Sequence, residues 1–172
     1  MPRTFGFIAA AALLAGTPAL AQDGPSDAEI AHIAYTAGAL DVAAAKQALA
    51  KSQNPEVRQF AETMLRDHQA VNDKAVALVT KLGVTPAENA ISAKLSSDAK
   101  ATEARLAALD GAAFDRAYAA NEVAYHQAVN AALSSALIPS ADNEELKALL
   151  ETGLTLFREH QTHAEHLAAD LK

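Results

Sequence analysis

The sequence predicts an all-α fold. Apolar residues recur at intervals of three and four along four long segments, which is the spacing of one helix face. Residues that cap or end helices separate these segments. The composition agrees, because alanine and leucine are frequent, tryptophan and cysteine are absent, and only 7 glycines occur in 172 residues.

Residues 1–21 have the features of a secretory signal peptide. Arg3 precedes an apolar run over 8–14, and Ala19-Leu20-Ala21 is a small-x-small cleavage signal. We therefore expect cleavage after Ala21, one domain over 22–172, and a periplasmic or secreted bacterial protein. No apolar stretch of the mature chain is long enough to span a membrane. The lack of cysteine excludes disulfides and thiolate metal sites.

The first two helices are predicted to form an antiparallel hairpin. Ser26 and Glu29 have capping-box spacing at the start of the first helix. Asn54-Pro55 is a sharp break, with Asn54 able to cap the second helix and Pro55 suited to its first turn. Gly83 supplies a left-handed stop. The expected helices cover 26–52 and 54–82.

The second half of the chain is predicted to be a crossover followed by another hairpin. Asp110-Gly111 separates the crossover from the third core helix, Pro139 is expected to end that helix, and Asp142 with Glu145 suggests a second capping box. Two antiparallel hairpins joined by a long helical crossover are the arrangement of a ferritin-like four-helix bundle. The expected helices cover 89–109, 112–137 and about 142–172.

Five ionisable residues fall on or at the edge of the predicted apolar faces. They are Asp41 on the first helix, His68 on the second, Glu122 and His126 on the third, and His160 on the fourth. Buried polar groups need partners, because an unpaired one is costly inside a core. The sequence therefore predicts a polar site in the interior.

Counting from the turns gives the expected height of each of these residues. Asp41 and His68 lie at nearly equal distances from the Asn54 break, so they should meet. With the second turn centred near Ser140, His126 and His160 differ in height by roughly 9 Å. Glu122 is then the better match for His160, with His126 one turn away.

Carboxylates and imidazoles from four helices are suitable ligands for iron, manganese or zinc. Ferritin-like proteins build such sites between their helices, commonly with a Glu-x-x-His pair on each of two helices. Here the one such pair is Glu29 to His32, in the first turn of a helix. The sequence thus favours a single-metal or degenerate site over a two-metal centre.

Structural roles for the same residues stay open. Asp41 and His68 could form a buried hydrogen-bonded pair without metal, and Glu122 and His126 could be solvated. Asp67 suits a surface acid or an acceptor that orients a ligand. Tyr118 and Tyr125 suit core packing, and His163 and His166 suit the negative end of a helix dipole.

Charge and motifs exclude several classes of function. The formal net charge of −7 becomes −8 without Arg3, since 13 basic and 21 acidic side chains are left. An acidic domain lacks the electrostatic footprint of nucleic-acid binding. No glycine-rich phosphate loop, serine elbow or cysteine nucleophile is present, so no nucleotide or organic cofactor is indicated. The oligomeric state is left open.

A set of motifs extends over the predicted helices. The motifs are Asp41-Val42, Asn54-Pro55-Glu56-Val57, Phe60-Ala61, Met64, Asp67-His68, Phe114-Asp115, Tyr118, His126 and His160. Together they resemble the bacterial family known as domain of unknown function 4142, often labelled an outer membrane protein. The resemblance covers about 27–171 and implies an exported ferritin-like four-helix bundle. His68, His126 and His160 match the family's histidines, whereas Asp41 stands where glutamate is common and Tyr125 where a polar residue is common.

Three functional hypotheses follow. The first is a metal-binding bundle with a metal-handling or oxidative-stress role. The second is a non-catalytic envelope or stress protein whose polar core is structural or senses acid through its histidines. The third is a redox enzyme with a two-metal centre, which the missing Glu-x-x-His pairs disfavour. No catalytic residue is indicated.

Overall fold

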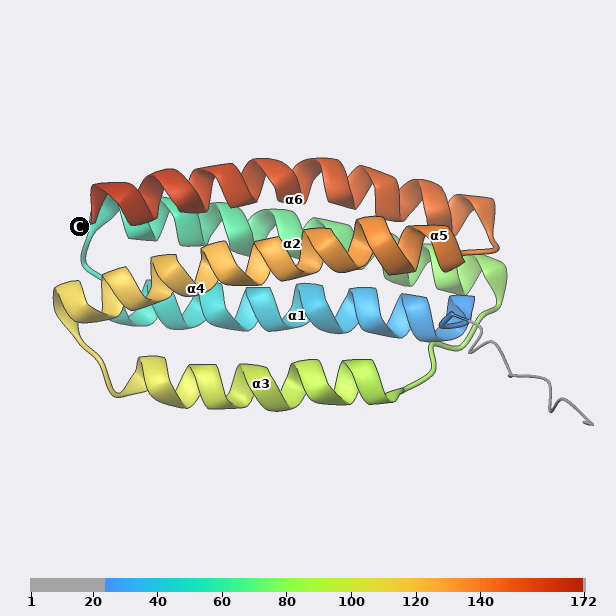
Figure 1. The fold of residues 1–172 in the computed structure, drawn as a ribbon, viewed down its shortest axis with the longest axis horizontal. Coiled ribbons are helices and arrows are strands. Elements are labelled where there is room, and N and C mark those ends of the chain that lie inside the picture. Colours follow the sequence, from blue (N-terminus) through green and yellow to red (C-terminus); the bar gives the residue numbers. More distant parts are fainter. Residues whose placement is uncertain (1–23, 172) are drawn as a thin grey trace, which may run out of the picture.

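The computed structural model describes residues 24–171, and the regular secondary structure of this part of the chain is helical, without a strand. The predicted all-α class is confirmed. The predicted signal peptide, residues 1–21, lies outside the described residues. Figure 1 shows the long helices side by side, with a shorter helix along one edge. The elements are α1 (Asp27–Lys51), α2 (Pro55–Leu82), α3 (Ala90–Ala107), α4 (Gly111–Ala132), η1 (Leu133–Leu137), α5 (Ile138–Ser140) and α6 (Glu144–Asp170).

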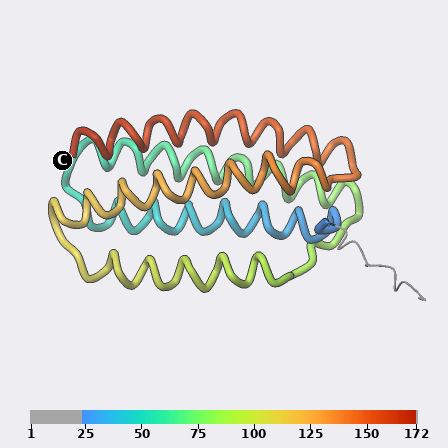
Figure 2. The backbone as a smooth tube through the Cα atoms, viewed as in Figure 1, coloured from blue at the N-terminus to red at the C-terminus, as the bar shows by residue number. Residues whose placement is uncertain are grey.

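Helices α1 and α2 form the hairpin that the sequence predicts. Ser26 and Glu29 make a reciprocal capping box at the start of α1. The side chain of Asn54 accepts bonds from two backbone amides of α2, and Pro55 lies in its first turn. Gly83 ends α2 with a φ of 65°, a left-handed conformation that glycine adopts without strain. The two helices therefore pack closely along their length (Figure 2).

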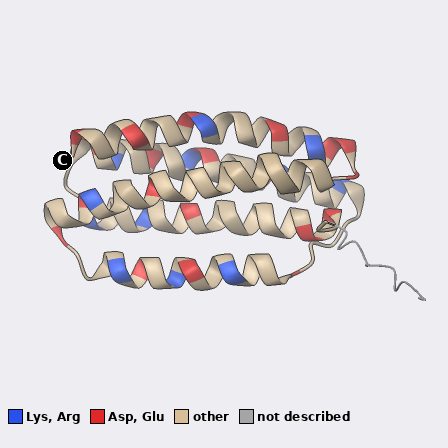
Figure 3. Ribbon diagram, viewed as in Figure 1, with Lys and Arg blue, Asp and Glu red and all other residues tan. Residues whose placement is uncertain are grey.

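Helix α3 crosses back along the outside of α1. Asn89 caps its start, and its packing is mainly on α1, with little contact to α4 (Figure 1). Two α1 side chains fasten it, since Gln47 donates to the carbonyl of Glu103 and Lys51 to that of Ala107. Charges of both signs alternate along it (Figure 3), as on a solvated helix face.

The third predicted helix does not end before Pro139. The chain stays helical through α4, the π-helical η1 and α5, as far as Ser140. Proline lacks the N–H of a regular helix and crowds the carbonyl four residues earlier. The wider turn of η1 directly precedes it, and the Ser134 and Ser135 hydroxyls donate to carbonyls of α4 there. The predicted end of this helix was therefore wrong by three residues.

The start of α6 also differs from the predicted capping box. Asn143, not Asp142, caps the helix and accepts from the amides of Glu145 and Leu146. The Asp27 carboxylate accepts from the backbone amides of Asp142 and Asn143, both at 2.9 Å. The turn is therefore fastened to the start of α1.

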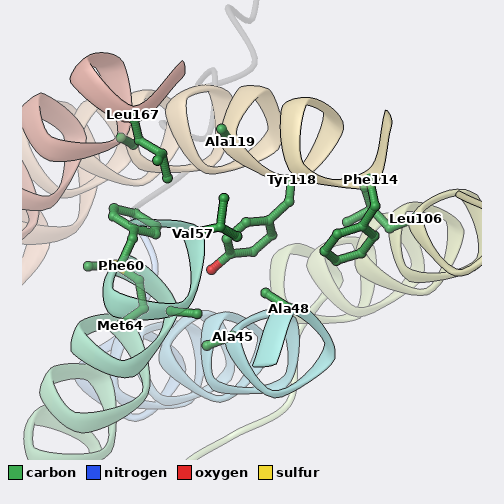
Figure 4. Close-up of a cluster of buried hydrophobic side chains, with 12 residues drawn as sticks. Ala45, Ala48, Val57, Phe60, Met64, Leu106, Phe114, Tyr118, Ala119 and Leu167 are labelled. Atoms are coloured by element: carbon green, nitrogen blue, oxygen red, sulfur yellow. The ribbon is translucent and has the colours of Figure 1, made fainter. Parts of the chain in front are cut away.

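The apolar core has two parts at different heights along the helices. The Tyr118 cluster joins the end of α1 and start of α2 to the start of α4 and end of α6 (Figure 4). The Leu150 cluster joins the opposite ends of these helices. The Tyr118 cluster includes Val57, Phe60, Met64, Phe114 and Leu167, and the Leu150 cluster includes Ile30, Ile33, Leu133, Leu146 and Phe157.

Candidate metal centre

The five predicted site residues are all buried and lie between the two apolar clusters. We call them the polar layer. Asp41, His68 and His160 are 2–3% exposed, and Glu122 and His126 are 1% exposed. In each long helix the chain passes from one apolar cluster through the polar layer to the other. The possibility that Glu122 and His126 are solvated is therefore wrong.

Asp41 lies at the centre of two contacts. Its Oδ2 is 3.4 Å from Nε2 of His68 and 3.6 Å from Nε2 of His126. The meeting of Asp41 and His68 agrees with the equal heights predicted from the α1–α2 turn. Both carboxylate oxygens of Asp41 are buried without a hydrogen-bond partner.

His126 belongs inside the layer, contrary to the prediction that it lies one turn away. Its ring centroid is 5.5 Å from that of His160 and 5.6 Å from that of His68. Because the helix continues to Ser140, the turn is centred near Asp142 rather than Ser140. This shift reduces the offset between His126 and His160 from roughly 9 Å to roughly 3 Å.

Glu122 is placed with Asp41 and His126 rather than with His160. Its Oε2 is 3.7 Å from Nδ1 of His126. Two groups of ligand atoms result, in each of which the atoms lie within 4.8 Å of one another. One is His68, His126 and His160, and the other is Asp41, Glu122 and His126.

Hydrogen bonds leave one free nitrogen on each of two histidines. Nδ1 of His126 is 3.0 Å from the backbone carbonyl of Glu122 and donates to it, so Nε2 is the free acceptor. Nε2 of His160 donates to Oδ2 of Asp67 at 3.1 Å, which leaves Nδ1. Arg66 holds the other oxygen of Asp67 at 2.7 Å. Asp67 therefore has the orienting role considered from the sequence, one that commonly accompanies metal-binding histidines.

His68 is held by stacking rather than by hydrogen bonds. Its ring lies on that of Phe157, with centroids 4.6 Å apart and planes 10° apart. Neither of its nitrogens has a hydrogen-bond partner. Buried polar atoms are nearly always paired, so a group of unpaired ones needs an explanation. The unpaired atoms of the layer are Asp41 Oδ1 and Oδ2, His68 Nδ1 and Nε2, Glu122 Oε2, His126 Nε2 and His160 Nδ1.

Burial shifts the protonation of the layer toward neutral forms. Desolvation lowers the pKa of His68 to about 3 and that of His126 to about 4, and it also lowers the pKa of His160. Desolvation raises the pKa of Asp41 to about 7. Desolvation also raises the pKa of Glu122 well above its ordinary value, with the neighbouring Asp41 as a second cause. The imidazoles are thus in the neutral form that binds metals, whereas the carboxyl groups must release protons to become ligands.

The remaining candidates lie outside the layer. The exposed His163 packs edge-on against Phe60, and His166 is exposed. Tyr125 donates to the carbonyl of Ala37 at 2.8 Å, which fits a packing role. The hydroxyl of Tyr118 is buried without a partner, and the pKa of Tyr118 is raised by burial and then by the charges of Glu122 and Asp41.

Sequence reasoning missed Asn72, which is 9% exposed on α2. It lies one turn after His68 on the same face, and its amide reaches α1 at Gly38, where a Cβ would collide with it. A polar residue between Val71 and Ala75 in the apolar series was the available signal.

Comparison with known protein families assigns the chain to one of them. The family described as Domain of unknown function (DUF4142) matches residues 9–167. The chain belongs to the DUF4142 family. This confirms the resemblance given by the sequence motifs. The DUF4142 description names no activity, so function has to be argued from the site. No curated protein and no solved structure matches the chain. None of the helices described here is both long and apolar enough to cross a membrane.

Proposed function

We propose that this protein binds one divalent first-row transition-metal ion in the polar layer. The observation that supports this most strongly is the concentration of buried, unpaired nitrogen and oxygen atoms on Asp41, His68, Glu122, His126 and His160. A metal ion would take one atom from each of several of these side chains as a ligand, whereas a buried atom without a partner costs about 1–3 kcal/mol of stability.

The spacing of the ligand atoms supports coordination to a single ion. Two ligand atoms that each lie about 2.1 Å from one ion, at a tetrahedral angle, are about 3.4 Å apart. The Asp41 oxygen is 3.4 Å from His68 and 3.6 Å from His126. Mixed imidazole and carboxylate ligands suit iron, manganese and zinc.

One ion is favoured over two because both ligand groups need His126. This residue has one free nitrogen, since its Nδ1 is bonded to the Glu122 carbonyl. A single nitrogen does not serve two ions, so we do not propose a two-metal redox centre.

The biological role we propose is metal handling by an exported ferritin-like bundle, including under oxidative stress. The hairpins α1–α2 and α4–α6 and the crossover α3 support that fold. The signal sequence expected over 1–21 supports export to a bacterial periplasm or exterior. Acid sensing through the histidines is less well supported, because the pKa values of His68 and His126, about 3 and about 4, lie below the mildly acidic range.

Metal analysis of protein purified without a histidine tag tests the proposal. After incubation with Fe²⁺, Mn²⁺ or Zn²⁺ and removal of free ions, we expect one ion per chain for at least one metal. Asp41→Ala/His68→Ala should retain less than a tenth as much. His163→Ala is the matched control, because His163 lies outside the layer and should leave the metal content unchanged. Equal, substoichiometric metal in all three proteins would refute the proposal.

A further inference from the structure

A cleft of about 880 Å³ connects the surface to the polar layer. It lies between α3 and α4, with α1 as its floor, and continues inward between α1 and α4 toward α2 and α6. Its wall includes Leu95 and Lys100 on α3 and also the buried Asp41, His68 and His126. The volume falls within the roughly 300–1,000 Å³ of small-molecule sites. The candidate ion is therefore reachable from outside.

The cleft exists because small side chains line the facing surfaces of α1 and α4. A helix surface of leucines would fill this space, whereas methyl groups and hydrogen atoms do not. Its wall is mainly apolar as a result. The small residues are Ala34, Ala37 and Gly38 on α1 and Ala124, Ala128 and Ala132 on α4.

The cleft is long in the direction of the helices. On α1 its wall extends from Ala31 to Gln47, and on α4 and η1 from Asn121 to Leu137. Each distance is about 24 Å at 1.5 Å per residue. One acyl chain of a lipid spans about half of a hydrocarbon core about 30 Å thick. An extended acyl chain therefore fits within the length of the cleft.

The buried polar side chains of the wall gather in one place, whereas α3 contributes exposed charged side chains to it. Asp41, Glu122 and His126 are nearly fully buried there, and their unpaired atoms lie within the group that could hold an ion. Asn72 adds an amide one turn from His68. A ligand that fills this cleft thus meets carbon along most of its length and a metal site at one point.

We propose that the cleft binds a straight-chain carboxylate of the fatty-acid class, with its carboxylate on the metal ion and its chain along the alanine-lined wall. This inference rests on the proposed metal site. Without an ion the carboxylate would be buried beside the carboxyl groups of Asp41 and Glu122, with no cation to offset its charge. A divalent ion supplies that positive charge, so binding of the acid requires the metal.

The direct test uses tag-free protein loaded with Co²⁺, whose visible spectrum reports changes in coordination. We expect dodecanoate to bind with one molecule per chain and to shift the spectrum. Acetate carries the same carboxylate without the chain. Because each buried methylene increases affinity about fourfold, dodecanoate should bind at least about 100-fold more tightly than acetate. The metal-free protein should bind dodecanoate at least tenfold more weakly.

Substitutions in the cleft test where the chain lies. Ala128→Phe and Ala132→Phe should weaken dodecanoate binding at least tenfold, while cobalt content and melting temperature stay as in the wild type. Both positions are exposed on the cleft wall, so the larger side chain does not disturb the core. Ala131→Phe is the matched control on the same helix, exposed and outside the cleft, and it should bind as the wild type does.

The outcomes separate this inference from the metal proposal. Full cobalt loading without dodecanoate binding would overturn the fatty-acid site and leave the metal site standing. Failure to take up any metal would overturn the proposed function itself. The inference would also be overturned if Ala128→Phe did not weaken dodecanoate binding, or if dodecanoate did not shift the cobalt spectrum. A protein that is a dimer and that Ala128→Phe dissociates would overturn it too, since a second copy would then occupy the cleft.

Discussion

The Tyr118 and Leu150 clusters and the polar layer between them are built from the same helices but contribute differently to stability. Phe60 and Leu150 bury carbon surface, which stabilises the fold without any ligand. The polar layer buries carboxyl and imidazole groups with unpaired atoms, which costs free energy. The difference indicates that the apolar clusters maintain the fold, whereas the layer serves a ligand.

The largest expected effect comes from breaking an apolar cluster. Phe60→Ala should destabilise the protein by about 3–5 kcal/mol, because it removes a fully buried aromatic ring and leaves a cavity. The loss should be the same with and without metal, as measured by urea unfolding. Val76→Ala, on the surface of the same helix, is the control and should cost less than about 0.5 kcal/mol. A metal-dependent cost of Phe60→Ala would show that the two regions are not independent.

Adding metal should stabilise the whole protein through binding in the polar layer. At a free metal concentration of 100 times the Kd, unfolding should cost about 2.7 kcal/mol more than in the metal-free protein. His163→Ala should show the same gain and Asp41→Ala/His68→Ala none, as measured by thermal unfolding over a range of metal concentrations. A similar gain in the double variant would indicate binding elsewhere.

Replacing a ligand residue by an apolar one should destabilise the metal-bound protein but stabilise the metal-free protein. In the metal-free protein, His68→Leu should raise the free energy of unfolding by about 1–2 kcal/mol, because it removes unpaired buried nitrogens while still packing on Phe157. With saturating metal the same variant should be less stable than the wild type. If His68→Leu destabilises both forms equally, His68 has a structural role.

The smallest effects should appear in the pH dependence of the metal-free protein. Because burial lowers the pKa values of His68 and His126, their contribution to the free energy of unfolding is present above about pH 6.5 and is lost as the pH falls toward 4 and 3. Because burial raises the pKa of Asp41, its contribution to the free energy of unfolding is present below about pH 4 and is lost as the pH rises through 7. Melting curves should therefore show that the gain from His68→Leu grows as the pH falls from about 6.5 toward 3, and that the gain from Asp41→Asn grows as the pH rises from about 4 to about 8. Gains that do not vary with pH would contradict these shifts.

Most of the fold could be predicted because its signals are local. Ser26 with Glu29, Asn54 with Pro55, and Gly83 each determine a helix end through a few neighbouring atoms. Pro139 misled the prediction because the π-helical turn before it, which depends on the chain on both sides, accommodates a proline within a helix. The choice of Asn143 over Asp142 as a cap was also not local, because Asp27 bonds the turn from α1.

The sequence was enough to predict which residues form the candidate site, but not which of them lie next to one another. A three-and-four spacing is enough to find Asp41, His68 and His160 on buried faces. The positions of His126 and Glu122 relative to His160 depended on where the α4–α6 turn is centred, and an error of two residues there changes their relative height by about 6 Å. The cleft could not be predicted from the sequence, because the separation of α3 from α4 depends on how the helices pack together.

The division of the polar layer between the two hairpins has a consequence for folding. Asp41 and His68 come from α1 and α2, and Glu122, His126 and His160 come from α4 and α6. Neither hairpin alone carries either complete ligand group. An ion bound here would act as a cross-link between the halves of the chain, since it binds tightly only after they have docked. Metal affinity in this protein would then measure how completely the chain has assembled.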